Sequence, residues 1–219
     1  MNGLSGHPRA RGGVMSAESP EYEVLRREGD LELRRYRQYL TASVKVSASG
    51  YNQATYAGFN PLADYIFGNN VAAGSISMTS PVTASRSTGM KIAMTAPVTS
   101  ERVRSEQLES ASPLCTVHCA GEYAVRFTMP SSFAALDELP EPNDPRVTLE
   151  AAPAHLTAVA RFGGRLDDEA VAKAVSALEA WIADQGLVAT GEPEAAQYDA
   201  PWRPGFIRHN EVLIPVKHS

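Results

Sequence analysis

The sequence contains few cysteines, few aromatic residues and no long apolar run. Only two of its 219 residues are cysteine, and 7% are aromatic. No stretch approaches the roughly 20 consecutive apolar residues of a transmembrane helix, which argues against a membrane span. Residues 1–13 are rich in Gly and Arg and lack the apolar core of a secretory signal. These absences predict a cytoplasmic protein with a disordered tail over residues 1–20 and one folded domain over 21–217.

The two cysteines flank a histidine, so a metal site or a disulfide has to be considered. On a strand, Cys115 and Cys119 would share a face but lie roughly 13 Å apart, and His118 would face the other way. That separation is too long for a disulfide, and the set is too small for a zinc site. We therefore predict two reduced thiols and no structural metal.

The charge balance is mildly acidic. Lys and Arg number 20 and Asp and Glu 25, which gives a net charge of −5. A nucleic-acid partner would require basic residues clustered on one surface. The short basic cluster of Arg34, Arg35 and Arg37 has neighbours that indicate an edge strand with an exposed face. We predict no nucleic-acid partner, and the sequence leaves any protein partner unknown.

An internal repeat with a displacement of 116 residues organises the chain. The triplet Leu40-Thr41-Ala42 recurs as Leu156-Thr157-Ala158 inside two segments with the alternation of strands. Downstream, Phe59-x-x-Leu62 matches Val175-x-x-Leu178, with the three- and four-residue spacing of one helical face. The repeat therefore predicts two strand–helix halves, at about 21–105 and 122–217.

The boundaries of the two helices follow from their flanking residues. The second begins after Asp167 or Asp168 and stops at Gly186. The first spans about 53–67 and stops at Gly68, and Pro61 should kink it or begin its regular part.

A shorter repeat and three further segments complete the predicted elements. Residues 76–82 recur as 92–98, which predicts two related strands joined by a loop, and the proline in each copy confines its strand to a sheet edge or a bulge. Residues 123–129 and 211–216 are predicted strands, and the Pro-rich stretch 140–145 is the predicted link into the second half.

These elements predict an α+β fold. Two strand–helix–strand repeats, related by pseudo-two-fold symmetry, would form a distorted β-barrel or curved antiparallel sheet flanked by two main helices. A concave cleft is expected where the halves meet, and such clefts are where small ligands bind.

Several segments together resemble the SOUL heme-binding protein family over about residues 21–216. They are Leu31–Tyr36, Gly58-Phe59, Tyr65-Ile66, Met94–Val98, Tyr198–Trp202 and Arg208–Val212. The resemblance implies a distorted β-barrel with two helices and binding of heme or another tetrapyrrole. The duplicated fold also resembles the wider GyrI-like effector-binding group.

The family resemblance places a ligand groove between the first helix and the loop before the last strand. The residues expected to line it or to meet the charges of the ligand are Tyr56, Phe59, Ala63, Asp64, Tyr198, Trp202, Arg203, Phe206 and Arg208. His209 is the candidate iron ligand. Tyr56 and Asp64 stand where one branch of the family has basic residues, and Arg35 stands where another has a proposed axial histidine. That histidine–iron bond therefore cannot form here.

Three functions remain open at this level. The first is a carrier or buffer for heme or another tetrapyrrole. The second is an effector-type module for another amphipathic or cationic small molecule. The third is a small hydrolase in which Glu211, with a pKa raised by an apolar cleft, acts as general base. Since no Gly-x-Ser-x-Gly elbow or phosphate-binding loop is present, we expect a binding protein and not an enzyme.

Overall fold

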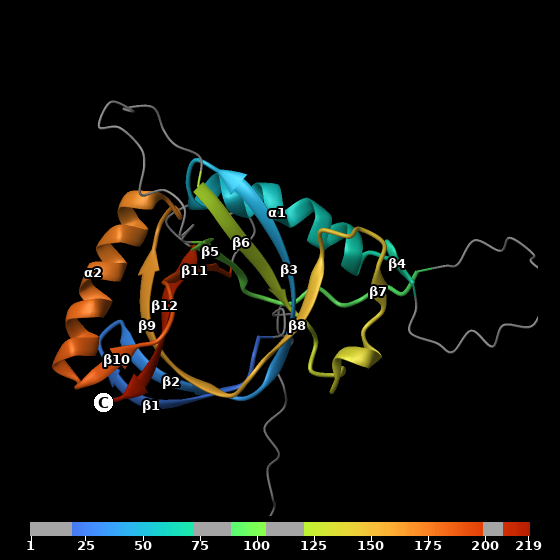
Figure 1. Ribbon diagram of the computed structural model, residues 1–219. Coiled ribbons are helices and arrows are strands. Elements are labelled where there is room, and N and C mark those ends of the chain that lie inside the picture. Colours follow the sequence, from blue (N-terminus) through green and yellow to red (C-terminus); the bar gives the residue numbers. More distant parts are fainter. Residues whose placement is uncertain (1–18, 72–88, 104–120, 199–207) are drawn as a thin grey trace, which may run out of the picture.

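A large, curved antiparallel sheet forms the body of the computed structural model, which describes residues 19–71, 89–103, 121–198 and 208–219 (Figure 1). In spatial order its strands are β1 (Tyr22–Glu28), β2 (Leu31–Tyr36), β9 (His155–Gly163), β12 (His209–His218), β11 (Glu194–Gln197), β5 (Val98–Val103), β6 (Gly121–Thr128), β3 (Tyr39–Ala48) and β8 (Thr148–Ala152). A tenth strand, β10 (Leu187–Ala189), pairs with β12 off this path. Within the described residues β1 and β8 do not pair, so the sheet stays open.

Two helices and a few small elements complete the fold. The helices are α1 (Tyr51–Ile66) and α2 (Asp168–Asp184). The small elements are the pair β4 (Asn70–Val71) and β7 (Glu141–Pro142), and the 3₁₀ turn η1 (Leu136–Glu138). The predicted α+β class, with a curved antiparallel sheet and two main helices, is confirmed. Among the described residues, no helix has the length and apolarity needed to cross a membrane.

Both helices cover the same face of the sheet. Val212, Ala195, Ser100 and Val125 are successive partners across β12, β11, β5 and β6, so their side chains lie on one face. Val212 and Ala195 pack in the cluster under α2, and Val125 packs in the cluster under α1. We call this the outer face, and we call the opposite face, which neither α1 nor α2 covers, the inner face (Figure 1).

Apolar burial on the outer face forms two clusters, one under each helix. Leu62 and Phe127 lie in the cluster under α1, and Leu178 and Ile214 lie in the cluster under α2, each at most 2% exposed. Each such side chain contributes roughly 1.5–3 kcal/mol relative to an exposed position. Because strand residues alternate between faces, this apolar outer face leaves the intervening residues for the inner face.

Each half of the sheet takes one end strand from the other half of the chain. The halves are β2-β9-β12-β11 and β8-β3-β6-β5, joined where β11 pairs with β5. Strand β2 thus pairs with β9 from the second half of the chain, and β8 pairs with β3 from the first. The order strand–strand–helix starts at residues 31, 39 and 51 and again at 148, 155 and 168. The two sets of starts are 117, 116 and 117 residues apart, within one residue of the proposed repeat, and the duplication itself stays a prediction.

The helix boundaries agree with the sequence signals. Asp167 caps α2, since its side chain accepts a hydrogen bond from the backbone N of Ala170 at 2.9 Å. Gly68 and Gly186 follow the two helices with φ of +115° and +64°, the left-handed region that glycine tolerates. The helix α1 begins ten residues before Pro61, so Pro61 does not mark the start of its regular part.

Two sequence predictions are wrong. Residues 92–97 are not a strand, and β5 begins at Val98. The backbone N of Ile92 instead donates to the carbonyl of Ile66 at 2.7 Å, which ties this segment to the end of α1, and Pro97 has no N–H to offer a strand partner. The edge position expected for Arg34 is also wrong, because β2 lies between β1 and β9 and Arg34 is 1% exposed.

Some predictions fall outside the described residues. These are the greater part of the N-terminal tail (residues 1–18), the first copy of the short repeat (76–82), the Cys115–His118–Cys119 group, and three expected groove residues, Trp202, Arg203 and Phe206.

Candidate ligand-binding cleft

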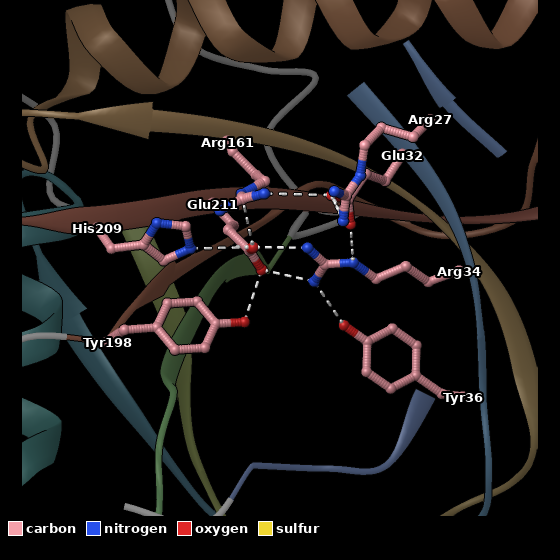
Figure 2. Close-up of polar contacts among 8 residues, drawn as sticks. All are labelled: Arg27, Glu32, Arg34, Tyr36, Arg161, Tyr198, His209 and Glu211. Atoms are coloured by element: carbon pink, nitrogen blue, oxygen red, sulfur yellow. Dashed lines mark hydrogen bonds and ion pairs between the residues drawn. The ribbon is translucent and has the colours of Figure 1, made fainter. Parts of the chain in front are cut away.

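The inner face carries a buried network of charged and phenolic side chains (Figure 2). Its centre is Arg34 on β2, which donates through both terminal nitrogens to Glu211 on β12, at 2.8 and 2.7 Å. Its Nε donates to Glu32 at 2.7 Å, and Nη1 also donates to the hydroxyl of Tyr36 at 3.2 Å. Such a two-pronged guanidinium–carboxylate pair is both strong and directional.

Each carboxylate of the network meets further partners. Arg27 and Arg161 lie 2.8 and 3.3 Å from the same oxygen of Glu32. The hydroxyl of Tyr198 donates to Glu211 at 2.6 Å, and Nε2 of His209 lies 3.1 Å from the other carboxylate oxygen. Three arginines thus surround two carboxylates, and this compensation allows both carboxylates to be at most 2% exposed.

The expectation that Glu211 is a general base with a raised pKa is wrong. Burial does disfavour its charged form, but the hydrogen bond and the charge of Arg34, with hydrogen bonds from Tyr198 and His209, outweigh burial and hold the pKa below its usual value. A carboxylate held in this way does not take up a proton near neutral pH. The same balance, dominated on the attractive side by Arg34, lowers the pKa of Glu32.

Beside this network the inner face is hollowed into a cavity of about 340 Å³. Nine strands contribute to its wall. Its lining residues are Ser19, Pro20, Tyr22, Tyr36, Tyr39, Thr41, Pro97, Thr99, Arg126, Thr128, Glu150, Ala151, Ala152, Pro153, His155, Glu194, Tyr198, Leu213 and Pro215. We call it the inner cleft. Its volume lies within the range of roughly 300–1,000 Å³ that is typical of small-molecule sites.

Four aromatic rings cluster on the wall of the inner cleft. The ring of Tyr36 lies 5.2 Å from Tyr22, 6.1 Å from Tyr39 and 5.5 Å from His155, measured between centroids. Its plane is almost parallel to that of His155, at 16°. Flat apolar surfaces of this kind suit a planar aromatic ligand.

The charged residues of the inner cleft carry an excess of negative charge. Arg126 lies 2.7 Å from Glu101 and 3.1 Å from Glu194, and Glu150 adds a further carboxylate to the wall. Burial raises the pKa of Glu194, and the charge of Arg126 offsets this only in part. Burial, with the nearby charge of Glu194, also raises the pKa of Tyr39 to about 12.

A second cavity of about 290 Å³ shares Tyr39 and Thr128 with the inner cleft. Its lining includes Arg37, whose side chain is 82% exposed and lies 3.2 Å from Glu21. An exposed pair of this kind contributes at most about 1 kcal/mol to stability, so Arg37 can exchange Glu21 for an anionic group in the second cavity at little cost.

The structure separates the predicted groove residues into two groups. On α1, Tyr56 and Asp64 are exposed, Ala63 is 7% exposed, and Phe59 packs against Phe127 in the outer-face cluster with ring centroids 5.4 Å apart. Tyr198 instead lines the inner cleft on the opposite face of the sheet. The structure therefore does not bring Tyr198 together with the residues of α1.

The other predicted residues lie at or beyond the ends of the charged network. His209 begins β12, and its Nε2 faces Glu211, so this nitrogen donates a proton and offers no lone pair to a metal. Arg208 precedes it and is half-buried. Arg35 lies 3.0 Å from Glu23 in an exposed pair. In the described parts of the chain, no group of three or more His, Cys, Asp or Glu side chains forms a candidate metal site.

Sequence reasoning missed most of the inner cleft, including Tyr36, Tyr39, Arg126 and His155. The signal that would have found them is alternation. In β9 the apolar residues Leu156, Ala158, Ala160 and Phe162 belong to the outer face, which places His155 on the inner face.

The fold is shared with solved structures of very different sequence. It is similar to the crystal structure of the EcmrR C-terminal domain, at 14% identity and a TM-score of 0.55 over 90% of this chain and 99% of that chain. A hydrolase from Listeria innocua is similar at 10% identity and a TM-score of 0.51, over 88% and 94% of the two chains. An uncharacterized conserved protein from the same organism is similar at 11% identity and a TM-score of 0.54, over 86% and 92%. At these identities the likenesses show the fold alone.

Sequence comparison gives a more specific result. The model of the SOUL heme-binding protein family matches residues 17–215, and the chain belongs to this family. No curated protein sequence matches it significantly. The family resemblance drawn from the motifs is confirmed.

The residues of the inner cleft fit a tetrapyrrole in three respects. The ring cluster around Tyr36 offers aromatic contact, His155 offers a nitrogen, and Arg37 in the adjoining second cavity can meet a propionate. The two carboxylates Glu150 and Glu194 oppose an anionic ligand, so the propionates would have to point away from them, toward Arg37.

Proposed function

We propose that the protein is a binding protein for a planar aromatic small molecule, with heme or another tetrapyrrole as its first ligand class. The site is the inner cleft. The observation that carries the proposal is the ring cluster of Tyr22, Tyr36, Tyr39 and His155 on the wall of a cavity of about 340 Å³. The family of the chain supplies the ligand class.

The role that fits this site is a carrier or buffer. Glu211, which sequence reasoning offered as a catalytic base, belongs to the buried network, and its charge is neutralised there by Arg34. The inner cleft itself offers aromatic rings beside the charged side chains of Arg126, Glu150 and Glu194, an arrangement that favours binding over chemistry.

Magnitudes predict modest affinity from apolar contact alone. Burying roughly 400 Å² of macrocycle surface at ~25 cal/mol per Å² gives about 10 kcal/mol. Association costs at least about 4 kcal/mol, and the remaining ~6 kcal/mol corresponds to a dissociation constant of tens of micromolar. A lower dissociation constant requires an additional strong interaction with iron or with a propionate.

The charge of the inner cleft favours a second candidate. The inner cleft contains two carboxylates, Glu150 and Glu194, and one arginine. That arginine, Arg126, is already ion-paired with Glu101 and Glu194. An amphipathic aromatic cation would gain from these carboxylates and from the face of the tyrosine rings. Glu150→Gln would weaken binding of such a cation and leave a neutral ring unaffected.

Titration with metal-free protoporphyrin IX tests the proposal, with ethidium as a planar cationic probe. Saturable porphyrin binding at micromolar protein supports the tetrapyrrole class. Saturable ethidium binding without porphyrin binding replaces it by the second candidate. Failure of both probes removes the inner cleft as a site for planar aromatic ligands.

Two variants then locate the site. Ala152→Trp places an indole in the inner cleft, since Ala152 lines it beside Tyr39, and should abolish porphyrin binding. Tyr56→Ala removes an exposed ring of α1, 53% exposed, and should leave binding unchanged. The reverse pattern would assign the ligand to the groove beside α1 that the family resemblance implied.

A further inference from the structure

We infer that His155 is the iron ligand of this protein, binding through Nε2 inside the inner cleft. The inference rests on the proposed function and deepens it, because it distinguishes an iron-bearing tetrapyrrole from a metal-free one. It replaces His209, the candidate from the sequence.

The first support is the hydrogen bond that fixes the imidazole. Nδ1 of His155 lies 2.7 Å from the carbonyl oxygen of Pro153. A carbonyl oxygen only accepts, so Nδ1 carries the proton and Nε2 carries the lone pair of the neutral ring. Histidines that bind metals commonly donate their other N–H to a backbone carbonyl in this way, which fixes the tautomer and the ring orientation.

The second support is that Nε2 remains available. His155 lines the inner cleft and is half-buried. Among the described residues, no hydrogen bond reaches its Nε2. The contrast with His209 is direct, because the Nε2 of that residue lies 3.1 Å from Glu211.

The third support is the rigidity of the ring. Tyr36 stacks on it at 5.5 Å and 16°, and Tyr39 packs against it at 6.0 Å and 46°. Held between these rings and the Pro153 carbonyl, the imidazole loses little conformational entropy when it binds a metal.

The phenols of the inner cleft are weaker candidates. An iron-binding phenol must lose its proton, and burial with the charge of Glu194 raises the pKa of Tyr39 to about 12. Burial also raises the pKa of Tyr36 above its usual value. A neutral imidazole binds a metal without losing a proton. His155 is therefore the favoured donor among the described residues of the cleft.

The experiment compares hemin with metal-free protoporphyrin IX on three proteins: the wild type, His155→Ala and His218→Ala. His218 is exposed near the end of β12 and serves as the matched surface control. We expect His155→Ala to weaken hemin binding at least tenfold and to shift the Soret band. Porphyrin binding should weaken by a clearly smaller factor, because the variant also removes one ring of the cleft wall. Added imidazole should restore the wild-type Soret position, and His218→Ala should match the wild type.

The outcomes distinguish the inference about His155 from the proposed function. If His155→Ala binds hemin with the wild-type Soret band and affinity, the inference is overturned while the proposed function stands. If the wild type binds neither hemin nor porphyrin, the proposed function fails and the inference fails with it. His155→Gln, which keeps bulk and polarity at the position but offers no imidazole nitrogen, replaces the alanine variant if that protein does not fold.

Discussion

Arg34 and Glu211 form a two-pronged pair at 2.7 and 2.8 Å although their strands are not neighbours. Strand β9 lies between β2 and β12, and the pair spans it on the inner face (Figure 2). The pair therefore joins the first and last parts of the chain, 177 positions apart, without a backbone hydrogen bond between the two strands.

The network around this pair should be sensitive to loss of one partner. Arg34→Met leaves Glu211 buried without its guanidinium, so we expect the free energy of unfolding to fall by about 3–5 kcal/mol. Urea denaturation measures this. The neighbouring Arg35→Ala is the control, because Arg35 is 58% exposed in a pair with Glu23 and its loss should cost at most about 1 kcal/mol. Equal effects of the two changes would contradict the central role of Arg34.

The stability of the protein should decrease in acid because of Glu32 and Glu211. The pKa of each is lower in the folded protein than its ordinary value of 4.5. Their contribution is therefore complete above about pH 4.5 and is lost as the pH falls through the folded pKa. The urea midpoint, measured at pH 7, 5, 4 and 3, should fall as the pH falls. The difference in midpoint between the wild type and Glu211→Gln should become smaller over the same range. A gap that stays constant over this range would count against the assigned pKa.

Glu194 should have the opposite dependence. Burial raises its pKa in the folded state, so its protonated form is favoured there, and the folded state loses stability as the pH rises through that pKa. Glu194→Gln should therefore equal the wild type near pH 4 and exceed it in urea midpoint at pH 7, with Glu101 still pairing Arg126. A variant less stable than the wild type at pH 7 would show that the attraction to Arg126 outweighs burial.

The contact between α1 and the sheet depends on Gly58. A Cβ atom at this position would lie 2.4 Å from the Cβ of Val125 on β6, which is closer than real Cβ contacts allow. Gly58→Ala should destabilise by about 1–3 kcal/mol through overpacking, although alanine is the better helix former. Thermal denaturation of Gly58→Ala with and without Val125→Gly checks the cause, because only glycine removes the Cβ of Val125. The double variant should lose less stability than the two single changes added together.

The fold was largely predictable from the sequence because it follows apolar periodicity. The helix stops at Gly68 and Gly186 and the two strand–helix units agree with the structure. The segment 92–97 was mispredicted because its resemblance to 76–82 outweighed the local effect of Pro97.

The inner cleft was predictable only in part. Tyr198 was predicted as a site residue, but Arg34 and Glu211 were each interpreted from the residues around them in the sequence. Taken alone, an arginine is usually exposed, and an unpaired carboxylate in an apolar cleft has a raised pKa. The pair explains both the burial of Arg34 and the lowered pKa of Glu211, and the sequence does not show that the two side chains meet. His155 was not among the predicted site residues for the same reason, since its neighbours in space, Tyr36 and Tyr39, lie more than 100 positions earlier in the chain.

The exchange of β2 and β8 between the two halves of the sheet has a consequence for dissection of the chain. A fragment that ends after β6 keeps β3 without its partner β8 and exposes the β3 edge, and the complementary fragment exposes the β9 edge for want of β2. Neither fragment should be monomeric in isolation, because bare strand edges and apolar outer faces promote association. Co-expressed, each fragment supplies the missing strand of the other, so a split pair would assemble only as a heterodimer and could report ligand occupancy by proximity.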